Sequence, residues 1–458
     1  MKKIFTSTRL SLSIILIITL SACEDFVTLD PPQTTLSTAT VFKDEATAKS
    51  AVNRIYIDMV QYSESFFAGT TSLNNMGGLS ADELDNYSSF NELAPFAANE
   101  VTPLNPNLMS KWNNIYNLIY QTNAVMRGLS ESTAIDELSK NQLLGEALFM
   151  RAYFHLLLVS FWGDVPWVTS TDYLINAKLS RSPAIEVYQN IIEDLVEAKN
   201  LLPAEAPQHI RPTKVAASAL LARVYLYTQN YGAAEAEASL VMVQVQLEED
   251  LSSVFLIESA EIIFQLQSIT PRINTWDGNS YVLISAPQDL ALKVSFIQAF
   301  EPGDLRQQAW TNSFTDGVEI WYYPFKYKVR TLPDANSSKT EFQVLLRASE
   351  MYLIRAEARA NLDNIAGASE DLNAIRTRAG LPVTNATDKN SMLLAIEHER
   401  RFELFTENGH RWLDLKRTNR LDAVIGSLKP GWQPTDALFP IPQFERNRNS
   451  NISQNPGY

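Results

Sequence analysis

Cysteine and histidine are scarce in this chain of 458 residues, which holds one and four of them respectively. A single cysteine cannot form a disulfide within the chain, and so few thiol and imidazole groups leave no zinc-type cluster to assemble. We therefore expect neither a metal site nor a cofactor. Basic residues are also few, because 38 lysines and arginines stand against 52 acids, for a formal net charge of −14. Such a surface repels nucleic acid and anionic membrane faces, which excludes both as partners.

The one cysteine, Cys23, follows a short apolar leader. A cationic beginning precedes an apolar run over residues 10–20, which is shorter than the roughly 20 residues that a membrane-spanning helix needs. This pattern is typical of a signal peptide over residues 1–22. Leu20-Ser21-Ala22-Cys23 resembles a bacterial lipobox, which implies cleavage before Cys23 and acylation of that residue. The alternative is a plain secretory signal with a chance cysteine.

The rest of the chain divides into a tether and one domain. Residues 23–40 are rich in proline, threonine and serine and are predicted to form a lipidated tether. Residues 41–458 are predicted to form a single domain. Apolar residues at helical spacing predict a helical scaffold, and stretches rich in glycine, proline and polar residues predict a loop-rich binding part. The scaffold is expected in about 41–62, 107–244 and 342–428, and the binding part in about 63–106 and 245–341.

An internal repeat supports the helical scaffold. Residues 214–244 and 344–378 align with an offset of 134 (356 minus 222), so that Ala222 matches Ala356. Small side chains at matched positions, on either side of a turn, let two helices approach each other closely. The spacing and the chemistry together resemble tetratricopeptide-type helix hairpins. A further helix is predicted from near Lys43 to about Tyr62.

The loop-rich part holds the candidate ligand-binding residues. Flat aromatic rings stack on sugar faces, and carboxylates or amides hydrogen-bond to hydroxyl groups. Side chains of both kinds gather in these stretches, where short strands are also expected around Ile262–Leu266 and around Val282 and Ile284. The alternative is an acidic, solvated loop whose aromatic rings cap a small sheet. The candidates are Asp82, Tyr87, Trp276, Asn279, Trp321 and Tyr322.

Residues 397–417 carry the densest alternation of charge and apolar bulk in the chain. If they are helical, Glu397 faces Arg401 and Glu407 faces Arg411 at a spacing of four residues. One interpretation is a lattice of carboxylates and guanidinium groups wedged among aromatic rings, which would attach this segment to several neighbours. The other is a general acid–base pair, but buried structural ion pairs perturb carboxylates just as readily.

Several motifs, in order along nearly the whole chain, resemble the SusD/RagB family of surface lipoproteins of Bacteroidetes. No single motif is diagnostic, and their ordered combination is highly specific. Asn408 departs from the family pattern, in which glycine usually follows the glutamate directly, and this departure lengthens a turn. The matching motifs are Leu20–Cys23 with Phe26–Pro32, Arg151–Tyr153 with Gly163–Pro166, Leu346–Ala358, Asn373–Gly380, Glu399–Arg417, Pro440–Pro442 and Gln454–Tyr458.

The resemblance implies a mainly α fold, in which tetratricopeptide-like helix pairs form a superhelical scaffold beside an irregular, loop-rich ligand-binding half with short strands. It implies a non-catalytic protein that captures oligosaccharides and passes them to a SusC-like TonB-dependent transporter. It also implies a lipid anchor in the outer membrane, with the protein facing the cell exterior. In that setting residues 397–417 belong to the scaffold. Five charged residues there are then expected to be buried and mutually paired: Arg401, Glu403, Glu407, Arg411 and Asp414.

Two alternatives to glycan capture stay open at this point. Some members of the family take protein-derived substrates, so a peptide- or glycopeptide-binding protein is one. A helical glycoside hydrolase is the other, because such enzymes use two carboxylates on either side of the scissile bond. Asp82 and Asp277 are the first acids to test for that role.

Overall fold

In a computed structural model, the chain is described over residues 41–61, 67–88 and 92–458. The predicted signal peptide, the lipidation site Cys23 and the tether over 23–40 lie outside the described residues.

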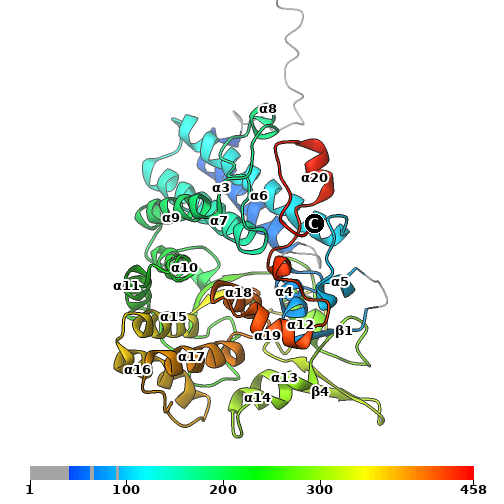
Figure 1. The fold of residues 1–458 in the computed structure, drawn as a ribbon. Helices are drawn as coiled ribbons and strands as arrows, with labels where there is room; N and C mark the ends of the chain where they lie inside the picture. The colour runs from blue at the N-terminus through cyan, green and yellow to red at the C-terminus, as the bar shows by residue number, and fades with distance from the viewer. Residues whose placement is uncertain (1–40, 62–66, 89–91) are drawn as a thin grey trace, which may run out of the picture.

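Long helices form the scaffold and stack along one side of the molecule (Figure 1). Helices that are adjacent in the sequence pack on each other, and the resulting pairs pack on the next pair. The prediction of a mainly α fold built on tetratricopeptide-like helix pairs is confirmed. The long helices are α3 (Glu45–Val60), α6 (Pro106–Glu131), α7 (Glu137–Trp162), α9 (Ala184–Leu201), α10 (Lys214–Tyr227), α11 (Tyr231–Met242), α15 (Ala348–Asn361), α16 (Ile365–Arg378) and α17 (Lys389–Glu403). The shorter helix α18 (His410–Arg417) follows α17 in the scaffold.

Shorter elements fill the other side of the molecule (Figure 1). The short helices are α4 (Leu73–Ser80), α5 (Ala94–Ala98), α8 (Tyr173–Asn176), η1 (Pro207–His209), α12 (Trp276–Tyr281), α13 (Val294–Gln298), α14 (Leu305–Trp310), α19 (Leu421–Leu428), η2 (Pro434–Ala437) and α20 (Gln443–Arg448). The strands are β1 (Leu84–Asn86), β2 (Ile262–Leu266), β3 (Leu290–Leu292), β4 (Thr311–Thr315), β5 (Ile320–Pro324) and β6 (Gln343–Arg347).

The first described long helix, α3, begins close to where the sequence predicts it. Asp44 precedes it, and its carboxylate accepts a hydrogen bond from the backbone N–H of Thr47 at 2.8 Å, which satisfies one of the unpaired amides of the first turn. The predicted apolar stripe is buried, including Val52 and Ile55. The helix ends at Val60, and the predicted end at Tyr62 lies outside the described residues.

The two copies of the internal repeat form the helix pairs α10–α11 and α15–α16. Both turns have a residue in the left-handed region, Gln229 at φ 59° and Asp363 at φ 62°. Both second helices begin after an asparagine side chain that accepts a backbone N–H from three residues on, at Asn230 and Asn364. Because these turns and caps coincide at the predicted offset, the repeat is one of structure as well as of sequence.

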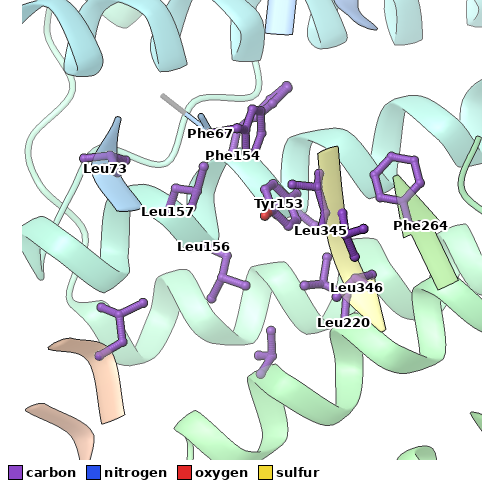
Figure 2. Packing of buried hydrophobic residues seen from close by; sticks show 14 of the residues in the cluster. Phe67, Leu73, Tyr153, Phe154, Leu156, Leu157, Leu220, Phe264, Leu345 and Leu346 are labelled. Carbon is purple, nitrogen blue, oxygen red and sulfur yellow. The ribbon is translucent and has the colours of Figure 1, made fainter. Parts of the chain in front are cut away.

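The hydrophobic core lies where the scaffold meets a two-stranded sheet of β2 and β6 (Figure 2). Side chains of α7, among them Tyr153 and Leu156, face Leu220 of α10 and the strand residues Phe264 and Leu346 (Figure 2). By length and apolar composition α7 could cross a membrane, but 94% of its most apolar window is buried inside the protein, so it is a core helix.

The predicted strand at Ile262–Leu266 is confirmed as β2, but the strand expected around Val282 and Ile284 is wrong. Val282 caps the end of α12, where its N–H binds the carbonyl of Gly278, and 282–284 pairs with no strand in the described part of the chain. The next strand is β3, which joins a four-stranded antiparallel sheet of order β1-β3-β5-β4.

Candidate functional site

The charged segment at 397–417 is not one helix. It forms the end of α17 and all of α18, with a turn between them in which Thr406, Asn408 and Gly409 have φ values of 51°, 49° and 69°. A left-handed backbone at three positions cannot continue an α-helix. Glu407 therefore does not face Arg411 across a helical turn, as the spacing alone suggested.

A buried charge lattice surrounds the end of α17. Glu403 forms ion pairs with three arginines from distant parts of the chain, Arg306, Arg347 and Arg378, at 3.1, 2.6 and 2.5 Å. Arg347 also binds Glu407 at 2.8 Å, and Lys326 binds the same carboxylate. These charges are almost completely buried. The lattice therefore ties α14, α16 and β6 to the turn after α17.

Burial alone would raise the pKa of Glu403, but the positive charges of Arg378, Arg347 and Arg306 outweigh it and hold the pKa well below its usual range. Arg347 and Lys326 likewise lower the pKa of Glu407 against the effect of burial. Both carboxylates are thus acceptors fixed in the ionised form, which is the state of a structural ion pair rather than of a general acid.

Of the other three charged residues, Arg401 and Arg411 pair outside the segment, whereas Asp414 pairs with two arginines of the segment itself. Arg411 binds the carboxylate of Asp82 with two hydrogen bonds of 2.8 and 3.0 Å, and Arg401 binds the same group at 2.8 Å. Asp414 is bound by arginines on either side of it in the sequence, Arg400 and Arg417. Among the described residues, none of the five predicted network members pairs with another of the five. The expectation of mutual pairing is wrong, since their partners come mostly from other elements.

Asp82 is a ligand-contact prediction that the structure corrects. Only 5% of its surface is exposed, and both of its carboxylate oxygens are held by Arg411. These charges lower its pKa even though burial opposes that shift. Asp82 therefore serves the charge lattice and is not available to a ligand.

The aromatic candidates Tyr87 and Trp321 lie on one face of the four-stranded sheet. Directly paired residues of antiparallel strands point to the same face, and neighbours along a strand point to opposite faces. In the β3–β5 pair Leu292 is opposite Tyr322, and in the β1–β3 pair Asp85 is opposite Ala291. Tyr87 follows Asp85 by two residues, and this periodicity places it on the face of Trp321, whereas Tyr322 points to the other side.

This sheet face is polar and partly open. Tyr87 is 43% exposed, and Trp321 is half-buried with its ring stacked on Phe314 at a centroid distance of 6.3 Å. Lys293 forms an ion pair with Asp85 on the same face. Partial burial, with the negative charges of Asp85 and Glu319, raises the pKa of Tyr87, so its hydroxyl stays a hydrogen-bond donor at neutral pH. We call these five partly exposed residues, Tyr87, Trp321, Asp85, Lys293 and Glu319, the sheet face.

A pocket of about 300 Å³ lies beside the sheet face and is lined mostly by polar groups. It is bordered by Asn279 of α12, by Arg330, and by Asp289, whose carbonyl accepts the backbone N–H of Tyr87 at 2.7 Å. The side-chain amide of Asn279 donates to the carbonyl of Arg330 at 3.1 Å, which leaves its oxygen for other contacts. Asn279 and Tyr87, both predicted from the sequence, thus flank one region.

The remaining candidates have structural contacts. Trp276 is half-buried, and its indole N–H donates to the carbonyl of Val60 at 3.0 Å. Tyr322 packs against the core on the opposite side of the sheet from Trp321. The carboxylate of Asp277, a candidate hydrolytic acid, is buried and accepts the N–H of Gly69 at 3.0 Å and the amide of Gln343 at 2.9 Å.

Sequence reasoning missed the charged members of this region, Lys293, Glu319, Asp289 and Arg330. Each lies at or near the end of a short strand or in a loop, where a single charge among polar residues gives no periodic signal. The one signal that could have found them is strand pairing, because β3, near residue 290, pairs with β1 on one side and with β5, near residue 320, on the other.

Helix pairs thus carry a partly open sheet whose surface presents aromatic and charged side chains. The chain belongs to the SusD/RagB family. Residues 29–226 match a family described as "Starch-binding associating with outer membrane", and residues 264–458 match the SusD family.

Similar proteins span more than nine tenths of the chain. SusD-like protein P2 of Formosa agariphila is 27% identical, over 97% of this chain and 98% of the relative. A SusD superfamily protein from Parabacteroides distasonis, whose structure is solved, superposes with a TM-score of 0.78 at 25% identity, over 93% of this chain and 100% of the other. A solved structure described as a laminarin-binding SusD-like protein superposes with a TM-score of 0.77 at 22% identity, over 91% of this chain and 100% of the other.

Proposed function

We propose that this protein captures oligosaccharides at the cell surface and passes them to a SusC-like TonB-dependent transporter in the outer membrane, without catalysis. Acylated Cys23 and the tether behind it would hold the protein on the outside of that membrane. The observation that carries the proposal is the sheet face: Tyr87 and Trp321 present partly exposed rings on one side of one sheet, beside carboxylates, a lysine and a polar pocket.

The chemistry of that face suits a sugar chain. A pyranose ring has an apolar face that stacks on an aromatic ring, and its hydroxyl groups accept from lysine and donate to carboxylates. Because water competes for every hydroxyl, such a site binds weakly, and delivery to a transporter makes a weak capture step useful. A pocket of about 300 Å³ beside the face has room for a sugar unit next to the stacked ring.

The relatives favour sugar over peptide. One matched family is described as starch-binding, and one structure with the same fold is described as laminarin-binding. The edge strands of the four-stranded sheet, β1 and β4, have only three and five residues, so an extended peptide could add to either edge over a few residues only.

The surroundings of Asp82 and Asp277, the two acids considered for hydrolysis, support a protein without catalysis. Asp82 is bound by Arg411 and Asp277 by Gly69 and Gln343, and both are buried. Neither can reach the two sides of a glycosidic bond at the sheet face. We expect no release of reducing sugar from any bound oligosaccharide. Hydrolysis that disappears in Asp82→Asn or Asp277→Asn would contradict the proposal.

The binding test uses an array of plant, algal and microbial oligosaccharides, followed by calorimetry with the best ligand. We expect Trp321→Ala to weaken binding by roughly 1–3 kcal/mol, through loss of a stacked ring. Trp276→Ala is expected to do the same if the ligand extends past α12. The matched control is Tyr225→Ala, which removes a half-buried ring from α10 in the scaffold. Unchanged affinity in both tryptophan variants would place the site elsewhere.

A further inference from the structure

A second pocket lies at the other end of the molecule from the sheet face. It is formed by α6, by the segment 166–177 that includes α8, and by α20 near the C-terminus, and its volume is about 270 Å³. In Figure 1 α8 and α20 lie at the top, whereas α12 and β4 lie toward the bottom. Nothing in the proposed capture at the sheet face uses this pocket.

Aromatic rings form much of its wall. Tyr116 and Tyr120 come from α6, and Tyr173 comes from α8. The ring of Tyr116 rests on buried Trp112 at a centroid distance of 4.9 Å, and its hydroxyl donates to the carbonyl of Pro166 at 2.9 Å, so this part of the wall is fixed. Tyr120 and Tyr173 are 49% and 76% exposed, and in the described part of the chain neither hydroxyl has a hydrogen bond.

Polar groups with unused hydrogen-bonding capacity line the same pocket. The half-buried carboxylate of Glu445 has no ion pair and accepts no hydrogen bond among the described residues. The side-chain oxygen of Asn176 is buried and has no hydrogen-bond partner in the described part of the chain, although its amide donates to the carbonyl of Ser170 at 2.8 Å. A buried acceptor without a donor is costly, and native proteins rarely keep one unless a water or a ligand supplies the hydrogen bond.

We propose that this pocket binds one ring of a neutral sugar. Tyr120 and Tyr173 supply exposed faces for stacking, and Glu445 and Asn176 supply acceptors for two of its hydroxyl groups. Pockets for drug-sized ligands usually measure roughly 300–1,000 Å³, so a volume of about 270 Å³ suits a single ring or a chain end rather than a long chain. Apart from Glu445, the polar side chains that line the pocket are neutral, which suits a ligand without charge: Asn113, Thr171, Asn176 and Asn449.

A site here would add a second contact for a polysaccharide that the sheet face also holds. When one site holds a polysaccharide, the local concentration of the same chain at the other site rises. Two weak sites together therefore retain a long chain better than either site alone. The two sites are nonetheless independent in structure, because no residue is shared between the pocket and the sheet face.

The test uses saturation-transfer NMR with three simple probes: methyl β-D-glucopyranoside, methyl α-D-mannopyranoside and methyl β-D-galactopyranoside. The background protein is Tyr87→Ala/Trp321→Ala, in which the sheet face is removed. We expect at least one glycoside to bind this background, and the added pair Tyr120→Ala/Tyr173→Ala to reduce its affinity at least fivefold. Glu445→Gln should weaken it several-fold while the pocket shape is kept. Tyr225→Ala on α10 is the matched control and should change nothing.

Each other result overturns the proposal. The two tyrosines are exposed, so loss of folding is checked by thermal unfolding and is not expected. Binding of no glycoside, or binding that ignores the tyrosine pair, excludes a sugar site in this pocket. Binding of tetramethylammonium with the same dependence on the tyrosines, and of no glycoside, would show an aromatic and carboxylate cage for a cation. Failure of the sheet-face proposal would instead appear as unchanged oligosaccharide affinity in Tyr87→Ala/Trp321→Ala, so the two failures are distinguishable.

Discussion

Trp310 and Trp321 lie eleven residues apart and differ in their surroundings. Comparing them separates a structural use of aromatic and charged side chains from a proposed ligand-binding use. Trp310 is completely buried, its indole N–H donates to the carbonyl of Leu251 at 2.8 Å, and Lys326 and Arg347 approach its ring. Trp321 is half-buried, and its ring stacks on Phe314 of the same hairpin. Around Trp310 the aromatic rings and charges stabilise the fold, whereas around Trp321 they are open to a ligand.

Burial determines how much a mutation of a charged residue changes the stability of the protein. Buried charges have lost their hydration, so each depends on its partners, and removing one partner leaves the other stranded. Partly exposed charges keep water as an alternative partner, and losing one changes stability little. Mutations in the charge lattice should therefore lower the free energy of unfolding, and mutations on the sheet face should lower the affinity for ligand.

The largest effect is expected for Arg347→Ala. This guanidinium binds Glu261, Glu403 and Glu407, all of them buried. Its loss leaves three carboxylates short of a positive charge, and breaking a buried pair typically costs about 3–5 kcal/mol. We expect a loss of unfolding free energy of at least that size, measured by urea denaturation.

The matched control for Arg347→Ala is Arg127→Ala, which breaks an exposed ion pair with Glu131 within α6. The urea midpoint of this control should stay unchanged within error. If the two variants unfolded at the same midpoint as the wild type, the lattice would not be what holds these elements together.

Arg411→Ala is expected to have the next largest effect. Its loss removes two hydrogen bonds from buried Asp82, which keeps only its ion pair with Arg401. The cost should fall near the lower end of the roughly 3–5 kcal/mol range, because one partner remains. The fraction that stays folded should bind glycan with unchanged affinity by calorimetry. A fully stable Arg411→Ala protein without glycan binding would assign this residue to the site instead.

Asp277 differs from the carboxylates of the charge lattice, because it is buried and its hydrogen-bond donors are the uncharged groups of Gly69 and Gln343. Burial raises its pKa to about 7, against hydrogen bonds from Gly69 and Gln343 that lower it. An unfolded aspartic acid titrates near 3.9. The folded protein therefore keeps this proton between about pH 4 and 7, and the resulting stability is present below that window and lost as pH rises through it.

Asp277→Asn has no proton to lose, so its stability relative to the wild type should rise between pH 5 and 8. Each pKa unit corresponds to about 1.4 kcal/mol, so we expect a relative gain of at least about 1 kcal/mol in urea denaturation. The side-chain N–H of the new asparagine can donate to the side-chain oxygen of Gln343, which has no partner among the described residues. A stability difference that stays constant with pH would show that this carboxyl is ionised throughout.

Much of the scaffold follows from local sequence. The helix α3 and the offset of the repeat follow from spacing alone, and the asparagines that cap α11 and α16 lie at matching positions. Local patterns failed at two places. Three left-handed residues divide the segment 397–417, and apolar Val282 and Ile284 have no strand to pair with.

The charge lattice and the sheet face were harder to predict, since both depend on residues far apart in the sequence. Glu403 meets Arg306 and Arg347 across separations of 97 and 56 residues. Asp82 looked like a ligand contact in a polar loop, and only the fold brings Arg411 to it. In the same way, Tyr87 and Trp321 share a face only because β3 lies between their strands.

The smallest effect on stability is expected for Lys293→Ala on the sheet face. Its ammonium binds Asp85, whose side chain is 41% exposed, so the pair is worth about 0–1 kcal/mol and the urea midpoint should barely move. If the sheet face binds sugar hydroxyls, the same variant should lose about 0.5–1.5 kcal/mol of glycan affinity, the value of one hydrogen bond. Lys199→Ala, which breaks a partly buried pair with Glu237 in the scaffold, is the control with the opposite pattern: some loss of stability and no loss of affinity. A Lys293→Ala protein that loses stability and keeps its affinity would reverse the assignment of the two regions, because it would make the sheet face part of the framework.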